Sequence, residues 1–364
     1  MKITHTLEDF SKLSGGLRTV VEDLNNNLLE NKINSQIVST RAEKEDNIIV
    51  SQRTLYKGIW CYSDTLKDTL IKTNSDINHI HGIWMYPQYI ASKISYKEKI
   101  PYIVTPHGML EPWLWKQGSS KKKLYFNLMI KKYFSNANIL HAITPDERDN
   151  LYTLFGHKNI EVIPNSISYK EIDSYNIQRQ DKEKFILFVG RLHPKKGIDL
   201  LIKAVSKLKD KDIRLKIAGP MNEYKNELDI LIKNLNIQNR VEFLGMVTGK
   251  EKFQLFKDAW VFVAPSFSEV VGMVNLEAGI LGTPVITTYQ TGLYKAWNKE
   301  GGILINPNID ELFSALSASI DWTQEERDAR GNALKAFIIE NYSWEKNIFK
   351  WIELYKGLEN AKPQ

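Results

Sequence analysis

The chain has 364 residues, of which 43% are hydrophobic and 25% charged. These values are typical of folded globular proteins and exclude disordered and collagen-like chains. The length exceeds what one ordinary hydrophobic core supports, so we expect two domains. The single cysteine, Cys61, excludes an intrachain disulfide and any multi-cysteine metal site, and it indicates a reducing compartment.

Nothing in the sequence is typical of secretion or of membrane insertion. Residues 1–10 lack the apolar run of a secretory signal. The longest apolar runs, near 185–189 and 260–265, are far shorter than the roughly 20 residues that a membrane span needs. We therefore expect a cytoplasmic protein, and peripheral binding at the inner face of the cell membrane stays open as an addition to this.

The net charge of +6 comes from one stretch of the chain. Residues 93–132 contain nine lysines against two glutamates, a local surplus larger than the net charge of the whole chain. Because the surplus is local, it predicts an anionic partner at one place rather than a generally basic surface.

Strand-like apolar runs alternate with helix-like segments, and the pattern restarts after a polar bridge at about 169–182. Before the bridge we predict strands at 35–39, 77–80 and 102–105, and helices at 16–31 and 121–134. After it we predict strands at 185–189, 214–218, 241–244, 261–264 and 285–287, and helices at 199–208, 224–235, 250–258 and 274–281.

This alternation predicts an α/β protein with parallel sheets built of βαβ units. Two such series indicate two Rossmann-like domains that face each other across a central cleft, at the carboxyl ends of their strands. We place the domains at 1–168 and 169–342, and we expect a helix at 343–364 to pack back on the first domain.

The most informative segment follows the predicted strand 261–264 and opens a helix. It carries Glu269 in the loop and Glu277 inside the helix, so the two carboxylates can hold different parts of one extended ligand. Gly272 permits a close backbone approach, and the amides of Met273 and Val274 lie at a helix end where phosphate binds readily. The alternative is a helix whose glutamates only suit its dipole.

A second segment follows the strand 185–189. There a loop bounded by Gly190 and Gly197 carries Arg191 and Lys196. Two cations at the carboxyl end of a strand can neutralise a diphosphate leaving group. The alternative is a solvated basic turn, which is weakened because the two-glutamate segment lies in the same domain and the same strand–loop–helix context.

Taken in order, these motifs resemble glycosyltransferase family four, a family of retaining nucleotide-sugar transferases with the GT-B fold. The resemblance is strong over about 184–305 and weaker in the first half. It rests on Gly190-Arg191-Leu192, Lys196-Gly197, Ser268-Glu269, Glu277-Ala278 and Gly282-Thr283-Pro284-Val285, with Ser14-Gly15-Gly16, His81-Gly82 and Pro106-His107-Gly108 before them.

The resemblance implies a role for each matching residue. Glu277 would hold the ribose of the donor nucleotide, and Glu269 would contact the hydroxyls of the donor sugar. Arg191 and Lys196 would bind the diphosphate. The remaining roles fall to the Gly15–Gly16 turn, which would approach the donor, and to His107, which would lie beside the transferred sugar.

One departure bears on the donor. Val270 stands where the family often has glycine, and Val271 stands where an aromatic residue is common. The loop at the sugar is therefore less flexible than in the family, and the donor's identity cannot be copied from better-known members.

The sequence offers two weak candidates for a metal site. His79 and His81 alternate along a predicted strand and share a face, but no third ligand is evident nearby, so we interpret them as a strand end. The Asp210-Lys211-Asp212 run resembles a metal-binding Asp-x-Asp but fits a solvated turn between a helix and a strand. We expect no metal and no other cofactor, since Arg191 and Lys196 can neutralise the departing diphosphate.

A basic and aromatic stretch at 113–134 carries Trp113, Trp115, Lys121, Lys122 and Lys123. This mixture is typical of a surface that contacts anionic lipid. An ordinary amphipathic helix packed on the first domain remains open as an alternative. We expect no nucleic-acid partner.

Together these features predict a metal-independent hexosyltransferase that moves a sugar, with retention, from a nucleotide-diphosphate donor to a carbohydrate acceptor. We favour a UDP-sugar, with a GDP-sugar as the alternative. A lipid-linked oligosaccharide of bacterial surface-polysaccharide synthesis (O-antigen, capsule or lipopolysaccharide) is the expected acceptor. The other functions left open are a nucleotide-sugar epimerase, a phosphorylase-like enzyme and a non-catalytic carbohydrate- or nucleotide-binding protein.

Overall fold

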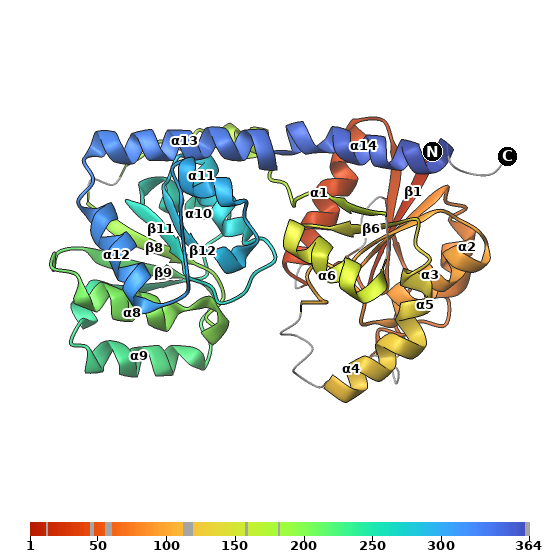
Figure 1. Ribbon diagram of the computed structural model, residues 1–364, viewed down its shortest axis with the longest axis horizontal. Helices are drawn as coiled ribbons and strands as arrows, with labels where there is room; N and C mark the ends of the chain where they lie inside the picture. The colour runs from red at the N-terminus through yellow and green to blue at the C-terminus, as the bar shows by residue number, and fades with distance from the viewer. Residues whose placement is uncertain are drawn as a thin grey trace. The chain divides into compact units, whose positions relative to one another are not determined.

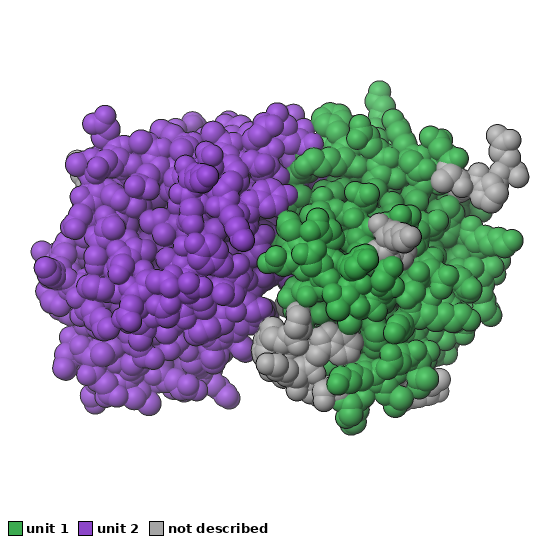
Figure 2. Space-filling view, in the orientation of Figure 1, with its two compact units in different colours: residues 1–165, 347–364 green, residues 166–346 purple. Residues whose placement is uncertain are grey.

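A computed structural model of the chain describes residues 1–11, 14–43, 47–54, 60–111, 119–156, 159–180 and 183–360. It divides into two compact units, coloured in Figure 2: unit 1 comprises Met1–Asn165 and Asn347–Gln364, and unit 2 comprises Ser166–Lys346. Each unit is built around its own parallel sheet, with helices on either side (Figure 1). The predicted α/β class is therefore confirmed.

Unit 1 holds a seven-stranded sheet in the order β3-β2-β1-β4-β5-β6-β7, with every neighbouring pair parallel. Its strands are β1 (Lys2–Leu7), β2 (Asn34–Ser39), β3 (Ile48–Val50), β4 (Ile77–His81), β5 (Tyr102–Thr105), β6 (Ile139–Ala142) and β7 (Ile160–Val162). All five residues of β4 are buried although three of them are polar, which is unusual because central parallel strands are ordinarily near-continuous apolar runs.

The helices of unit 1 connect these strands. They are α1 (Gly16–Glu30), α2 (Leu66–Lys72), α3 (Tyr86–Lys97), α4 (Ser119–Tyr125), the π-helical turn η3 (Phe126–Ile130), α5 (Lys131–Phe134) and α6 (Pro145–Phe155). The last helix, α14 (Trp344–Asn360), begins in unit 2, and its residues from Asn347 onward belong to unit 1. There its Trp351 ring lies 4.5 Å from the ring of His141.

The predicted helix at 121–134 is interrupted, and the burial pattern explains why. Phe126, Ile130 and Phe134 are all buried and recur every four residues. In an α-helix, whose period is 3.6 residues, such a series drifts around the helix by about 40° at each step. The wider π-helical turn η3 restores the register, so all three side chains stay in the core.

Unit 2 holds a six-stranded parallel sheet in the order β10-β9-β8-β11-β12-β13. Its strands are β8 (Phe185–Val189), β9 (Arg214–Ala218), β10 (Val241–Gly245), β11 (Val261–Ala264), β12 (Val285–Thr288) and β13 (Ile303–Ile305). Its helices are α7 (Tyr169–Ser174), α8 (Ile198–Lys207), α9 (Tyr224–Asn234), α10 (Gly249–Asp258), α11 (Met273–Ile280), α12 (Ile309–Ile320) and α13 (Gln324–Tyr342). All five strands predicted after residue 182 are confirmed to within one residue.

The carboxyl ends of β8, β9 and β10 come together through their backbones. Gly219 donates its N–H to the carbonyl of Gly245 at 2.7 Å, and a Cβ on Gly219 would lie 1.9 Å from the carbonyl oxygen of Gly190. Only glycine fits at such a contact. This edge of the sheet is therefore lined by closely packed backbone, next to the start of the loop that carries Arg191 and Lys196.

Candidate active site

Two loops of unit 2 are locked together at the carboxyl edge of its sheet. Gly197 adopts φ +67, and a Cβ there would lie 2.2 Å from the carbonyl oxygen of Pro265. The amide of Phe267 donates to the carbonyl of Lys195 at 2.9 Å. The loop after β8 and the loop after β11 thus share backbone contacts, which fixes the groups that they carry relative to each other.

Lys196 and Glu269 meet where these loops touch. Lys196 lies in a short 3₁₀ turn, Pro194–Lys196, and its ammonium donates a hydrogen bond to Oε1 of Glu269 in an ion pair. Ser266 donates to the same oxygen at 3.2 Å. Both charged side chains are about one-fifth exposed. The structure therefore brings together two residues that the sequence predicted to serve one ligand, separated by 73 positions in the chain.

Arg191 lies in the same loop but stands apart from this pair. Its side chain is exposed, and no ion pair ties its guanidinium to any residue in the described parts of the chain. It is therefore available to an anion from outside the protein.

The amino end of α11 adds a second group of polar atoms. Gly272 caps the helix without a side-chain hydrogen bond, and the amides of Met273 and Val274 are the first of the helix. The first amides of a helix have no acceptor within it and carry its positive dipole end. On the next turn, Glu277 accepts a hydrogen bond from Nζ of Lys252 at 2.9 Å.

Lys252 is a residue that the sequence analysis missed. It lies on α10, where the pattern predicted a helix but gave no sign of which side chains would face α11. Its pairing with Glu277 depends on how the two helices pack against the sheet. No motif in the sequence could have indicated it.

Asn275, also missed, is a buried amide with unmet hydrogen-bonding capacity. Its side chain is 1% exposed, and within the described residues neither Nδ2 nor Oδ1 has a partner. A Cβ on Gly272 would lie 2.7 Å from that Nδ2 and 3.9 Å from Cγ of Glu269, so the amide sits close to the Glu269 loop. Oε2 of Glu277 is likewise buried and unpartnered. Buried polar atoms ordinarily have partners, so this cluster fits a polar ligand group.

In unit 1, His107 lies in the turn after β5 with φ +54, a left-handed conformation that is uncommon for a residue with a side chain. The next amide, Gly108 N–H, donates to Oε1 of Glu147 at 2.6 Å, and Ile143 N–H donates to Oε2 at 2.8 Å. Burial raises the pKa of Glu147 to about 7. Glu147 thus holds the His107 turn, and the sequence analysis missed it.

The other predicted residues of unit 1 have different surroundings. Gly15 caps α1 with φ 78 and ψ −146, a conformation that only glycine adopts readily. Among the described residues, no atom lies within 4 Å of where a Cβ on Gly15 or Gly16 would be. Trp113 and Trp115 lie outside the described residues. Lys121 and Lys123 are exposed, whereas Lys122 is half-buried and lies over the ring of Trp84.

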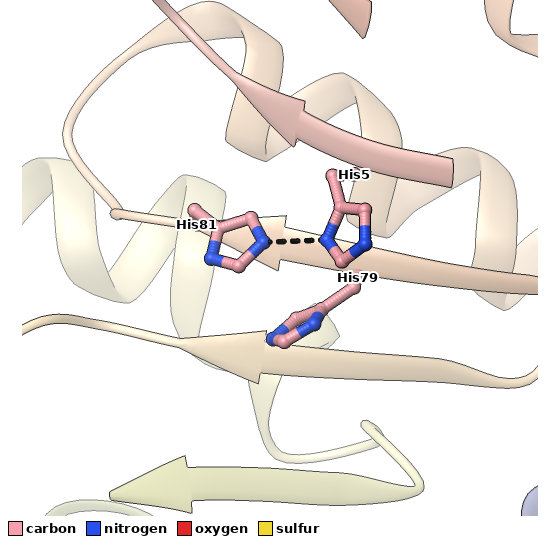
Figure 3. A group of neighbouring side chains, drawn as sticks. All are labelled: His5, His79 and His81. Atoms are coloured by element: carbon pink, nitrogen blue, oxygen red, sulfur yellow. Dashed lines mark hydrogen bonds between the residues drawn. The ribbon is translucent and has the colours of Figure 1, made fainter. Parts of the chain in front are cut away.

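The histidines of β4 have a third neighbour, so our reason for setting them aside as metal ligands was wrong. Strand β1 places His5 opposite His79, and the ring nitrogens of His5, His79 and His81 come within 4.8 Å of one another (Figure 3). The rings fit a metal poorly, because hydrogen bonds already occupy both nitrogens of His79 and of His81. A metal would have to displace several of these bonds.

The comparisons with known proteins agree with the fold and with both halves of the chain. Residues 170–335 match the family described as Glycosyl transferases group 1, and residues 14–171 match Glycosyltransferase Family 4. An uncharacterized glycosyltransferase of Methanocaldococcus jannaschii is 29% identical over 298 residues, covering 77% of this chain and 75% of that one.

Solved structures of the same fold cover essentially the whole chain. Sucrose-phosphate synthase from Thermosynechococcus elongatus superimposes with a TM-score of 0.80 at 18% identity and covers 100% of both chains. HepE of Anabaena, in complex with UDP and glucose, has a TM-score of 0.77 at 17% identity and covers 98% of this chain and 100% of that one. The two family matches show that the chain belongs to the group 1, family-four-like glycosyltransferases, and the superpositions show that it has the GT-B fold.

Proposed function

We propose that the protein transfers a sugar, with retention of anomeric configuration, from a nucleotide-diphosphate donor to a carbohydrate acceptor. The observation that carries this proposal is the polar cluster at the carboxyl edge of the unit 2 sheet. There two lysine–glutamate pairs flank the open amino end of α11 and the unpartnered amide of Asn275. A ligand with a diphosphate and several hydroxyls complements such a cluster.

The donor is held along this cluster. Glu277 accepts hydrogen bonds from the ribose hydroxyls, while Glu269 binds the hydroxyls of the donor sugar. Arg191, Lys196 and the amides of Met273 and Val274 bind the diphosphate, with Gly272 allowing its close approach. Lys196 must exchange Glu269 for a phosphate oxygen when the donor binds, and this exchange frees the Glu269 carboxylate for the sugar.

During transfer, the bond between the anomeric carbon and the diphosphate oxygen breaks as the acceptor oxygen attacks from the same face. The proton of the acceptor hydroxyl passes to the departing phosphate. Charge grows on the leaving group, and Lys196 with the helix amides stabilises it there. These cations do the work that a divalent ion would otherwise do, so we propose that the reaction is metal-independent.

In unit 1, His107 and the Gly15–Gly16 turn bind the part of the substrate that reaches that unit. For the donor base we favour uracil over guanine, because the related fold of HepE is found with UDP and glucose. This argument concerns the base of the donor nucleotide and gives no information about the acceptor.

The acceptor is a lipid-linked oligosaccharide, and the surface of the 119–134 segment supports this part of the proposal. Leu124 and Leu128 are 62% and 69% exposed, one turn apart, among exposed lysines. Apolar side chains flanked by lysines suit a surface of anionic lipid. No helix in the described parts of the chain is long and apolar enough to cross a membrane. We therefore propose peripheral binding at the inner face of the membrane, in the assembly of a bacterial surface polysaccharide such as O-antigen, capsule or lipopolysaccharide.

The test is a thermal-shift screen of UDP-, GDP-, ADP- and dTDP-sugars, followed by turnover with and without lipid-linked acceptors in buffer containing EDTA. We expect one class of donor to stabilise the protein, and turnover to need the acceptor and survive the chelator. Donor conversion without an acceptor would identify an epimerase instead. Release of the sugar to inorganic phosphate would identify a phosphorylase-like enzyme. Binding without turnover under any condition would contradict an enzymatic role.

A further inference from the structure

Most of the histidines of this chain gather in one place. Strands β1, β4, β5 and β6 are neighbours in the sheet, and His79 lies opposite His5 while His81 lies opposite Thr105. Since residues two apart share a face of a strand, these side chains form one polar row. The histidines in or beside this row are His5, His79, His81, His107 and His141, five of the seven in the sequence.

In one branch of this row, the last acceptor fixes which atom donates in every hydrogen bond. The carbonyl of Ile163 can only accept, so His141 donates to it from Nε2, at 2.8 Å. Burial lowers the pKa of His141 to about 4, so the ring is neutral and its Nδ1 accepts from the hydroxyl of Thr105 at 2.9 Å. Thr105 has then used its proton, so His79 Nε2–H donates to it at 2.7 Å, and Tyr355 donates to His79 Nδ1 at 2.7 Å.

The other branch leads to His107. Nδ1 of His5 lies 3.0 Å from Nε2 of His81, the bond drawn in Figure 3, and Nδ1 of His81 lies 3.0 Å from Nε2 of His107. His5 and His81 are fully buried. Because each neutral ring has one donor and one acceptor, the branch can run in only two directions.

The buried end of this branch decides between them. Nε2 of His5 has no partner among the described residues. If the bonds ran from His107 inward, this nitrogen would carry an N–H buried without an acceptor. If they run from His5 outward, the lone pair of His5 Nε2 lacks a donor, but no buried N–H is left without an acceptor. Orphaned buried N–H groups are rare in proteins, so the outward direction is favoured.

We propose that His5 and His81 are positioning residues that hold His107 as a neutral imidazole with its proton on Nδ1. In this form His107 presents an N–H donor to a sugar hydroxyl of the substrate; this last step rests on the function proposed above. A neutral donor suits a glycosyl transfer, because the transition state places positive charge on the sugar, which an imidazolium would repel.

Two further features support this role. Burial, together with the neighbouring His141, lowers the pKa of His107 to about 3, which keeps the ring neutral at ordinary pH. The backbone of the same turn is held separately, since Glu147 accepts the amide of Gly108. The ring and the backbone of His107 are thus anchored by different groups, and the relay can be removed without removing the anchor of the turn.

The experiment measures the histidine tautomers directly, by long-range proton–nitrogen NMR on protein with ¹⁵N-labelled histidine, alongside steady-state kinetics. His5→Leu removes the relay, while His5→Asn keeps an amide where Nδ1 was. Tyr355→Phe is the matched control, because it deletes one buried hydroxyl from the other branch. Thermal melting and donor binding to unit 2 show whether each variant is folded.

In the wild-type protein we expect His107 to be protonated on Nδ1. In His5→Leu we expect both tautomers of His107 and a tenfold lower kcat, with the donor KM unchanged within twofold. His5→Asn should restore the single tautomer and kcat to within twofold of the wild type, and Tyr355→Phe should leave the tautomer of His107 unchanged.

Four results would overturn the proposal: wild-type His107 protonated on Nε2, a tautomer insensitive to His5→Leu, an equal effect of Tyr355→Phe, or a Zn²⁺-induced shift of the His5 and His81 nitrogens, which would identify a metal site. The tautomer readout needs no substrate. If it comes out as expected while no donor is turned over, the proposed function fails and the relay stands.

Discussion

The two sheets have the same parallel topology but opposite chemistry at their polar groups. In unit 1 the row contains imidazoles and a threonine hydroxyl, buried and joined by hydrogen bonds. In unit 2 the groups are ammonium and carboxylate pairs, about one-fifth exposed and contributed by separate loops and helices. Burial disfavours the charged form of a side chain, whereas partial exposure and an opposite charge allow it.

This difference indicates how one fold serves two tasks. The charged edge of unit 2 can exchange its internal ion pairs for the charges of a ligand, as the function proposed above requires of Lys196. The neutral row of unit 1 can offer fixed hydrogen bonds without adding charge near the substrate. The two networks can be perturbed separately, so the contrast between a buried neutral network and a partly exposed charged one can be tested.

The largest expected effect is a loss of folding stability at acid pH, and this loss should be confined mainly to unit 1. Burial lowers the folded-state pKa of His5 and His107 to about 3 and that of His141 to about 4. Unfolding therefore takes up protons below pH 6.5, and stability falls as the pH drops through that value. At pH 5 each of these three rings costs about 2 kcal/mol. Glu147, whose pKa is raised to about 7, offsets about 2 kcal/mol of the loss between pH 7 and pH 5, because the folded state takes up its proton over this range.

Urea unfolding at pH 7 and pH 5, resolved by unit with pulsed hydrogen exchange, measures this effect. The midpoint of unit 1 should fall more than that of unit 2 between the two values. Glu147→Gln should deepen the acid sensitivity, because it removes the offsetting group. A larger fall for unit 2 would show that the neutral network does not set the pH response.

Among substitutions at the charged edge of unit 2, Lys196→Ala should lower activity most. Losing one stabiliser of the leaving diphosphate should cost roughly 3 kcal/mol, or about 10²-fold in kcat, as for an oxyanion-hole donor. The measurement is kcat at saturating donor. Lys195→Ala, in the same turn, is the matched control and should keep near-normal turnover. Near-normal kcat in Lys196→Ala would remove the role that we assign to this cation.

Unit 1 also carries charge, on the exposed Lys121 and Lys123 and the half-buried Lys122, and these lysines test what that charge does. Replacing all three with glutamine should weaken binding to anionic vesicles by about two orders of magnitude, at about 1 kcal/mol for each lysine. The effect should shrink with salt, since the attraction is screened over roughly 8 Å at physiological ionic strength. Co-sedimentation at low and high salt measures it.

The matched control replaces three exposed lysines of unit 2, Lys207, Lys209 and Lys233. Vesicle binding should be unaffected in this variant, and donor binding should be intact in both. Equal partitioning of all three proteins, insensitive to salt, would leave the 119–134 segment as an ordinary packed helix and remove the main support for a lipid-linked acceptor.

The smallest effect separates the two glutamates within the charged edge. Glu277 should meet only the ribose, which does not change during the reaction, so Glu277→Ala should raise the donor's Kd about tenfold with kcat little changed. Glu269 lies at the sugar, so Glu269→Ala should lower kcat by more than it raises Kd. Isothermal titration and single-turnover kinetics distinguish them, and identical signatures would mean that both carboxylates serve one place.

Much of the fold was predictable because short apolar runs indicate the buried strands of parallel sheets. Five of the six strands of unit 2 follow this rule and were predicted to within one residue, whereas β13 was not predicted. Strand β1 was missed because its sequence, with His5 between two threonines, lacks an apolar run. The interruption of the 121–134 helix was also missed. The π-helical turn depends on the packing of Phe126, Ile130 and Phe134 in the core rather than on local helix propensity.

The sequence by itself determined the fold class, the order of the motifs and the presence of Lys196, Glu269 and Glu277 in strand-end loops or the helix after them. These follow from local signals: periodicity, loop residues and spacing along the chain. Only the tertiary structure decided the partners. It paired Lys252 with Glu277, brought His5 to His81 and set Glu147 behind the His107 turn. Such contacts depend on strand register and helix packing, which arise when segments far apart in the chain bury their apolar faces together.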